Sequence, residues 1–164
     1  MSQERVRASD VSLREITEDT VVTIVRLSVA EGQKGFVAPN AVSLAQALFS
    51  KAAWYRAIYL GDEPVGFVML YDASLLDPPE PEIGVWRFMV DERYQGRGVG
   101  REALVQVIAH VRAKGGFKAL ELSYVPGPGC PEPFYRSLGF MPTGRMEDDE
   151  VVLELPLDGV AQGG

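Results

Sequence analysis

The sequence predicts an α/β domain in which helices cover both faces of a mixed, mostly antiparallel sheet. Short apolar runs of strand type are separated by amphipathic stretches with helical spacing. Tight turns join several of the strands as hairpins, whereas one strand–helix–strand run favours a parallel pair. The length of 164 residues suits a single domain with its own core. We assign residues 11–157 to this domain and expect flexible ends at 1–10 and 158–164.

The first elements are a strand and two helices. Alternation of apolar and polar residues from Val11 predicts a strand over 11–16. Thr17 is a suitable N-cap, and the acidic residues after it favour a first helical turn. This helix is expected to run to Val29, because its apolar residues repeat with a period of about 3.6 and glycines follow. Pro-Asn at 39–40 then opens a second, short helix.

A β-hairpin is expected next, with strands at 54–60 and 65–71 around a Gly-Asp-Glu-Pro turn. Gly66, inside the second strand, indicates a bulge or a close backbone contact. A stiff, acidic connection at 77–82 leads to an apolar strand over 83–90. The middle of the chain is therefore predicted to form three successive strands.

The longest helix follows a glycine-rich turn and is amphipathic. Its apolar positions lie at helical spacing: Val99, Ala103, Leu104, Val107, Ile108 and Val111. Two glycines end it, and a strand follows over 119–125. The Pro- and Gly-rich stretch 126–131 precedes a short helix around Tyr135. Strands at 140–146 and 150–157 form a final hairpin.

Charge and composition restrict the class of partner. The net charge of −7 disfavours nucleic acid, which needs a basic surface, and suits a cationic substrate. No apolar segment has the length of a membrane span, and the first residues lack a signal-peptide stretch, so a cytoplasmic location is expected. The single cysteine, Cys130, excludes an internal disulfide and a cysteine-based metal cluster. We expect no metal, and a homodimer is an open alternative to a monomer.

Residues 95–100, Gln-Gly-Arg-Gly-Val-Gly, lie between the strand at 83–90 and the long helix. This order places free backbone N–H groups at a helix N-terminus, where they can bind phosphate oxygens. A P-loop is disfavoured, because Arg101 and Glu102 stand where it needs a lysine and a hydroxyl residue. A dinucleotide fingerprint fits in part, and Glu121 lies about twenty residues on, where a ribose-binding acid belongs. Dinucleotide binding therefore stays a distant alternative.

The loop also fits the pattern Gln/Arg-x-x-Gly-x-Gly/Ala, which Gln95, Gly98 and Gly100 match in full. In this the chain resembles the GCN5-related N-acetyltransferase (GNAT) superfamily, in which the loop holds the pyrophosphate of acyl-CoA. Phe-Tyr-Arg-Ser-Leu-Gly-Phe at 134–140 is similar to the C-terminal motif of the family. The resemblance covers nearly the whole chain, from 11 to about 156. It implies the GNAT fold and acetyl-CoA as co-substrate.

The resemblance also implies roles for single residues. Those expected to bind acetyl-CoA are Phe88, Met89, Val90, Gln95, Gly96, Arg97, Gly98, Val99, Gly100 and Arg101. Tyr135 matches the tyrosine that protonates the departing CoA thiolate, and the alternative is an aromatic that only packs. A backbone N–H near Met89 or Val90 is the candidate donor to the oxyanion. One departure is Pro128, where many members have an asparagine that contacts the pantetheine arm.

The general base is less well defined. Glu82 shares strand parity with Trp86 and Phe88 and is therefore expected to face the same cleft, with a solvated surface carboxylate as the alternative. His110, the single histidine, is expected on the surface of the long helix. An acyl-enzyme on Cys130 is disfavoured, because no histidine motif accompanies it. Glu82 is accordingly the candidate base.

Segments 36–40, 86–91 and 94–96 resemble the bacterial spermine/spermidine acetyltransferases. This resemblance implies direct transfer of acetyl from acetyl-CoA to a primary amine, such as that of a polyamine, in a ternary complex. A long cation needs carboxylates around an apolar slot, with an aromatic face as a further contact. The residues available are Glu31, Asp72, Asp77, Glu80, Glu82 and Trp86, although the acids are also explained as ordinary loop charges. Alternatives are another amine (an antibiotic, an amino acid or a protein N-terminus) and a non-catalytic acyl-CoA-binding module.

Overall fold

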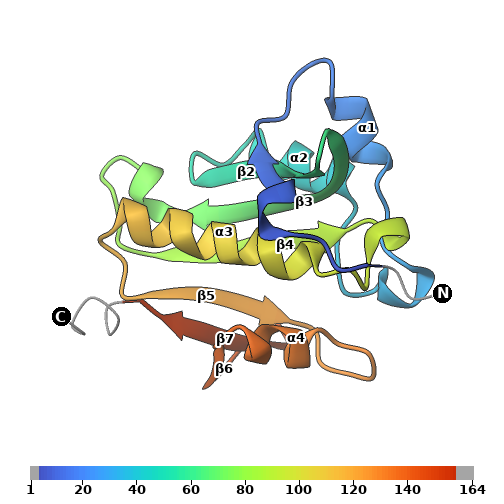
Figure 1. Ribbon diagram of the computed structural model, residues 1–164. Helices are drawn as coiled ribbons and strands as arrows, with labels where there is room; N and C mark the ends of the chain where they lie inside the picture. The colour runs from blue at the N-terminus through green and yellow to red at the C-terminus, as the bar shows by residue number, and fades with distance from the viewer. Residues whose placement is uncertain (1–3, 158–164) are drawn as a thin grey trace.

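A computed structural model describes residues 4–157 and contains one seven-stranded sheet (Figure 1). Its order is β1-β2-β3-β4-β5-β7-β6, and every neighbouring pair is antiparallel except the parallel pair β4 and β5. The strands are β1 (Val11–Arg14), β2 (Ala53–Leu60), β3 (Glu63–Asp72), β4 (Ile83–Val90), β5 (Ala119–Tyr124), β6 (Met141–Glu147) and β7 (Glu150–Pro156). The predicted fold class is confirmed.

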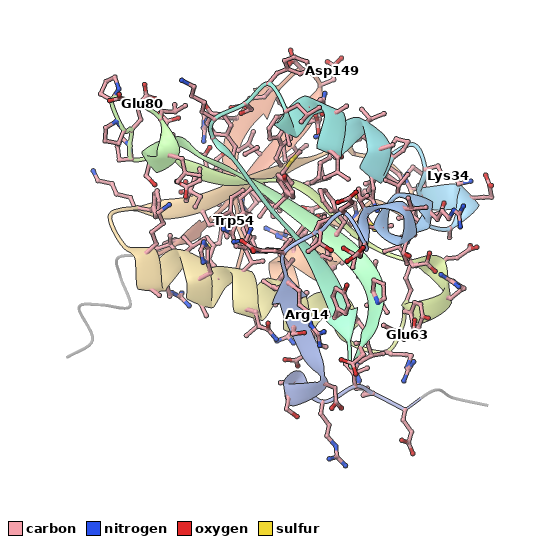
Figure 2. All side chains as sticks on the ribbon, turned by 90° about the horizontal axis from the view of Figure 1, so that it is seen from above. Arg14, Lys34, Trp54, Glu63, Glu80 and Asp149 are labelled. Atoms are coloured by element: carbon pink, nitrogen blue, oxygen red, sulfur yellow. The ribbon has the colours of Figure 1, made fainter. Side chains whose placement is uncertain are left out.

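Helices cover both faces of the sheet, as Figure 2 shows from above. They are α1 (Val21–Arg26), α2 (Asn40–Ala47), α3 (Val99–Lys114) and α4 (Glu132–Ser137), with short 3-10 turns η1 (Ala8–Asp10), η2 (Glu31–Gln33), η3 (Ala73–Leu75) and η4 (Glu92–Tyr94). The apolar face of α3 forms one core cluster against the sheet. Residues from α1, β2, β3 and β4 form a second cluster on the opposite face, against which α2 packs. The sheet is therefore buried on both sides.

Helix α1 is much shorter than the sequence predicts. Its N-cap position is Thr20, which makes no side-chain capping bond, rather than Thr17, because Thr17 forms a preceding turn in which its N–H donates to Thr20 Oγ1 (2.9 Å). It ends at Arg26, since the backbone N–H of Ser28 instead donates to the carboxylate of Asp91 (2.9 Å). The helical sequence is also rich in β-branched residues, whose helix propensity is low.

Strand β4 contains a bulge that reverses its side-chain alternation. Val85 pairs with Leu70 and Arg87 pairs with Met69, which leaves Trp86 as an extra residue between them. Val85 and Phe88 consequently pack against the α3 cluster, whereas Trp86 packs against the opposite one. The prediction that Trp86 and Phe88 face the same side of the sheet is therefore wrong.

The parallel pairing of β4 with β5 is short. Only Gly84 with Glu121 and Val85 with Leu122 are in register, and beyond Val85 the two strands diverge (Figure 1). The rest of β4 thus presents backbone groups along an edge that β5 does not cover. This divergence creates the place where a ligand can lie between the strands.

On its other side β4 lies very close to β3. A Cβ on Gly66 would lie 2.5 Å from the carbonyl oxygen of Met89, so only glycine permits this approach. A register shift also occurs opposite Gly66, between Ile58 and Tyr59 of β2. Both readings of Gly66 from the sequence, a bulge and a close contact, are confirmed.

Of the expected flexible ends, residues 1–3 and 158–164 lie outside the described part of the chain. Residues 4–10 are described, and 8–10 form the turn η1. Val6 donates its backbone N–H to the carbonyl of Arg97 (2.9 Å), which places this segment beside the glycine loop.

Candidate active site

The glycine loop joins η4 to α3 in a left-handed conformation. Gly96 has φ +79° and Gly98, the N-cap of α3, has φ +92°. Residues with a side chain rarely adopt these angles, so glycine is needed at both positions. The turn leaves the first N–H groups of α3 without helical partners, which suits an anionic ligand.

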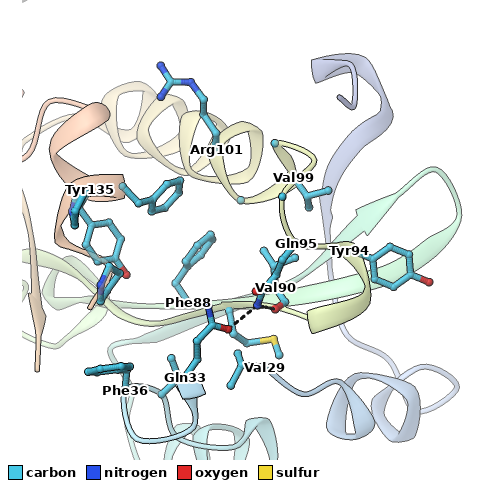
Figure 3. Close-up of a pocket in the computed structure, with 18 of the residues that line it drawn as sticks. Val29, Gln33, Phe36, Phe88, Val90, Tyr94, Gln95, Val99, Arg101 and Tyr135 are labelled. Atoms are coloured by element: carbon cyan, nitrogen blue, oxygen red, sulfur yellow. Dashed lines mark hydrogen bonds between the residues drawn. The ribbon is translucent and has the colours of Figure 1, made fainter. Parts of the chain in front are cut away.

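The side chain of Gln95 fixes the loop by hydrogen bonds to neighbouring segments (Figure 3). Its Nε2 donates to the carbonyl of Val90 (2.8 Å) and to Oε1 of Gln33 in η2 (2.8 Å). Gln33 in turn accepts from the backbone N–H of Ala30 (3.3 Å). Gln95 therefore connects the loop, β4 and the segment before α2, a long-range contact that the motif alone does not indicate.

A first cavity of about 640 Å³ lies between the loop, β4 and α4. Its walls include Arg5, Gln33, Cys130 and Phe134 together with residues of the glycine loop. All of the residues predicted to bind acetyl-CoA line this cavity except Arg97, whose side chain donates to the carbonyl of Glu4 (3.4 Å). The predicted set is thus gathered around one cavity, with Arg97 as the exception.

Backbone parity identifies which groups of β4 face the uncovered edge. Asp91 donates its N–H to Val65 of β3 (2.8 Å), and the carbonyl of Met89 points at Gly66 of β3. Alternate residues of a strand direct their backbone groups to opposite sides, so Phe88 and Val90 direct theirs toward β5. The N–H of Val90, rather than that of Met89, therefore faces the opening.

Tyr135 lies on α4 and lines both the first cavity (Figure 3) and a second one. Its ring packs against Phe134 (centroids 5.5 Å apart) and Phe140 (6.0 Å). Burial raises the pKa of Tyr135 to about 12. In the described chain no group hydrogen-bonds its hydroxyl, so a neutral phenol is held where it can donate to a ligand.

The second cavity, of about 1200 Å³, opens on the other side of Tyr135. Its carboxylates come from the start of β4 and from β5, β6 and β7: Glu82, Glu121, Glu147, Glu150 and Glu154. Arg145 pairs with Glu121 and with Glu147. Within residues 4–157 the other three form no ion pair, although Glu150 accepts from Ser123 Oγ (3.3 Å) and attracts Arg87 electrostatically. Trp86 and Tyr71 supply aromatic surface, with an edge-to-face contact at 6.3 Å.

The acids expected around a cationic substrate are mostly elsewhere. Asp72 is fully buried, pairs with Lys114 and accepts from the N–H of Ser74 (3.0 Å). Glu31 pairs with Lys34 (2.7 Å), and neither Asp77 nor Glu80 lines either cavity. Glu82 alone of that set lines the second cavity. The sequence did not identify the carboxylates of β5, β6 and β7 as lining a substrate cavity, because acids that alternate along a hairpin ordinarily lie on its solvent-facing side.

His110 is half-buried, which corrects the expectation of a surface position. Its ring stacks on Trp54 of β2 with centroids 4.3 Å apart, and burial, with Lys114 and Arg56 nearby, lowers the pKa of His110. His110 lines neither cavity, and neither does Pro128.

No group of three or more His, Cys, Asp or Glu side chains within 4–157 is arranged to hold a metal ion. Among the described helices none combines the length and the apolar character needed to span a bilayer.

Comparison with known proteins agrees with this geometry. Residues 20–140 match the model of the Acetyltransferase (GNAT) family. The chain is 27% identical over 141 residues to the spermine/spermidine N(1)-acetyltransferase of Bacillus subtilis (strain 168), covering 84% of this chain and 91% of that protein.

Solved structures share the fold. A domain from Methanocaldococcus jannaschii superposes with a TM-score of 0.72 at 15% identity, covering 90% of this chain and 98% of that one. A GNAT family acetyltransferase from Elizabethkingia anophelis with acetyl-CoA bound superposes with a TM-score of 0.63 at 18% identity, covering 90% of this chain and 99% of that one. The chain therefore belongs to the GNAT family and is an acetyl-CoA-dependent N-acetyltransferase.

Proposed function

We propose that the acceptor is a polyamine such as spermidine or spermine, and that its primary amine attacks acetyl-CoA directly in a ternary complex. The observation that carries this proposal is the second cavity, whose lining combines the aromatic surface of Trp86 with three carboxylates that form no ion pair within residues 4–157. Carboxylates attract the distal ammonium groups of a polyamine, and aromatic faces attract cations as well. The Bacillus relative, named for spermine and spermidine, supports the same substrate class.

In this proposal acetyl-CoA occupies the first cavity. Its diphosphate lies on the N–H groups of residues 96–100, and its pantetheine arm pairs with the uncovered edge of β4 at Phe88 and Val90. The thioester carbonyl then accepts from the N–H of Val90, which stabilises the oxyanion as the amine adds. Tyr135, which lines both cavities, stands beside the junction of the two substrates.

The reaction needs a base for the attacking amine and an acid for the departing thiolate. The attacking ammonium must first lose a proton, and Glu82, exposed at the edge of the second cavity, accepts it directly or through water. Nitrogen then bonds to the carbonyl carbon, and collapse of the tetrahedral intermediate breaks the carbon–sulfur bond. Tyr135 donates its hydroxyl proton to the departing thiolate and is reprotonated by the second proton that the acetylated nitrogen releases, so the products are the neutral amide and free CoA.

A second candidate acceptor is an amine that also carries a carboxylate, such as an amino acid or a peptide N-terminus. Lys34, Arg87 and Lys118 line the same cavity and favour it. Arg87 nevertheless has partners already, because it donates to the carbonyl of Trp86 (2.9 Å) and to Gln46 (3.1 Å). Lys34 is likewise paired with Glu31 (2.7 Å), which leaves Lys118 and the unpartnered Nε of Arg87 as the basic donors within residues 4–157, fewer than the three carboxylates that form no ion pair.

The deciding experiment follows free thiol release from acetyl-CoA with spermidine, spermine, an aminoglycoside, free amino acids and a short peptide. The proposal expects the highest kcat/KM with the polyamines. Higher kcat/KM with amino acids or the peptide would replace the polyamine by the second candidate. Acetyl-CoA binding without turnover on any amine would indicate a binding module instead.

A further inference from the structure

The N-terminal segment lies against the glycine loop and is held there by two contacts. Val6 donates its N–H to the carbonyl of Arg97 (2.9 Å), and Arg97 Nε donates to the carbonyl of Glu4 (3.4 Å). The side chain of Val6 also packs against the α3 core cluster. Arg97 is therefore occupied in holding residues 4–6, which explains why it does not line the first cavity.

Arg5 takes the position that the motif assigned to Arg97. It lines the first cavity, and its Nη1 lies 3.4 Å from the point where a Cβ on Gly98 would be. In the part of the chain from 4 to 157, no carboxylate pairs with Arg5. Arg101, the other arginine of the cavity, reaches instead toward Ser137 Oγ of α4 (3.4 Å).

We propose that Arg5, which the N-terminal segment holds beside the glycine loop, binds the diphosphate of acetyl-CoA, an inference that rests on the proposed placement of that diphosphate on residues 96–100. A guanidinium presents paired N–H donors that match phosphate oxygens, and its charge adds to the neutral N–H groups of the loop. The contribution matters more in a chain of net charge −7, whose overall field repels an anionic ligand. Neither the loop motif nor its flanking sequence indicates this residue.

The test measures the affinity of the full-length protein for CoA by calorimetry, without any amine. Arg5→Gln is expected to weaken binding by roughly 5- to 20-fold, the range for a charge-assisted contact that stays partly exposed. Arg5→Lys keeps the charge but loses the paired donors, and is expected to fall between Arg5→Gln and the parent protein. Arg7→Gln is the matched control, because Arg7 is exposed and lines neither cavity, and its affinity should stay within about twofold.

Two further measurements locate the contact. Binding of the parent protein should weaken more steeply with rising salt than binding of Arg5→Gln, since one ionic contact is missing in the variant. Dephospho-CoA, which lacks the 3′-phosphate, should show the same fold-loss for Arg5→Gln as CoA does. A loss seen with CoA but absent with dephospho-CoA would assign Arg5 to the 3′-phosphate and overturn the diphosphate contact.

Failure of this inference is distinct from failure of the proposed function. If the parent protein binds CoA and Arg5→Gln binds equally well, or if Arg7→Gln loses as much affinity, the role of Arg5 is overturned while the acceptor proposal stands. If the parent protein does not bind CoA, the placement of acetyl-CoA in the first cavity is itself wrong.

Discussion

Replacement of Tyr135 by phenylalanine removes one hydroxyl group from the wall between the two cavities. The ring would remain packed against Phe134 and Phe140, because those contacts do not involve the oxygen. No group in residues 4–157 hydrogen-bonds the hydroxyl, so no buried partner is left unsatisfied. We therefore expect the free energy of unfolding to change by less than about 0.5 kcal/mol.

The expected effect on the reaction is much larger. A positioned general acid contributes about 10²- to 10⁴-fold to a rate. The pKa of Tyr135 is about 12, whereas that of an ordinary thiol is about 8.5, so proton transfer to the thiolate is poorly matched. This mismatch places the expected loss of kcat near the lower limit, about 100-fold or about 2.7 kcal/mol.

The raised pKa also predicts a pH dependence. Tyr135 stays protonated, and hence able to donate, at every pH below its folded value of about 12, so its ionisation should not lower kcat at pH 8 to about 10. Between the unfolded pKa of about 10 and the folded value, the native state binds more protons than the unfolded state. The free energy of unfolding should therefore fall by about 2–3 kcal/mol in total as the pH rises through that window. The Tyr135→Phe protein should lack this pH-dependent loss.

The assay measures kcat and both KM values from free thiol release, together with the thermal midpoint of each protein. A kcat loss near 100-fold with an unchanged midpoint is the expected result. A kcat within about threefold of the parent enzyme, with the variant folded, would show that the thiolate leaves without this proton, and the general-acid role would be wrong.

Three further changes test the base, the sheet and a buried carboxylate. Glu82→Gln should lower kcat/KM for the amine by about 10- to 100-fold. Glu80 lies outside both cavities, so Glu80→Gln should not lower it. Equal effects of the two substitutions would show that Glu82 is not the base. Gly66→Ala places a Cβ 2.5 Å from a backbone oxygen of β4 and should lower the free energy of unfolding in denaturant by about 1–3 kcal/mol. Gly35→Ala, whose Cβ meets nothing within 4 Å, is the control. A Gly66→Ala protein as stable as the parent would contradict the close approach. Burial alone would raise the pKa of Asp91, but hydrogen bonds to its carboxylate lower it, so its stabilisation is present above the unfolded pKa of about 3.9 and is lost as pH falls through the folded value. Asp91→Asn should accordingly cost about 1–3 kcal/mol at pH 7 and progressively less as the pH falls below the unfolded pKa, and a pH-independent cost would argue against ionic stabilisation.

Much of the fold was predictable because it is encoded by neighbours in the chain. The amphipathic period of α3, the hairpin of β2 and β3 and the glycine loop before α3 are local patterns, and each appears where the sequence indicates it. Helix α1 is the exception, because a long-range bond from Ser28 to Asp91 ends it early.

The sequence by itself indicated the family, the glycine loop and the position of Tyr135, since each depends on residue identities at short, fixed spacings. Only the tertiary structure decided which side chains meet in the site. The bulge at Trp86, the divergence of β4 from β5 and the exchange of Arg97 for Arg5 depend on contacts between segments far apart in the chain. Periodicity cannot reveal such contacts, because a single extra residue in one strand moves every later side chain to the other face.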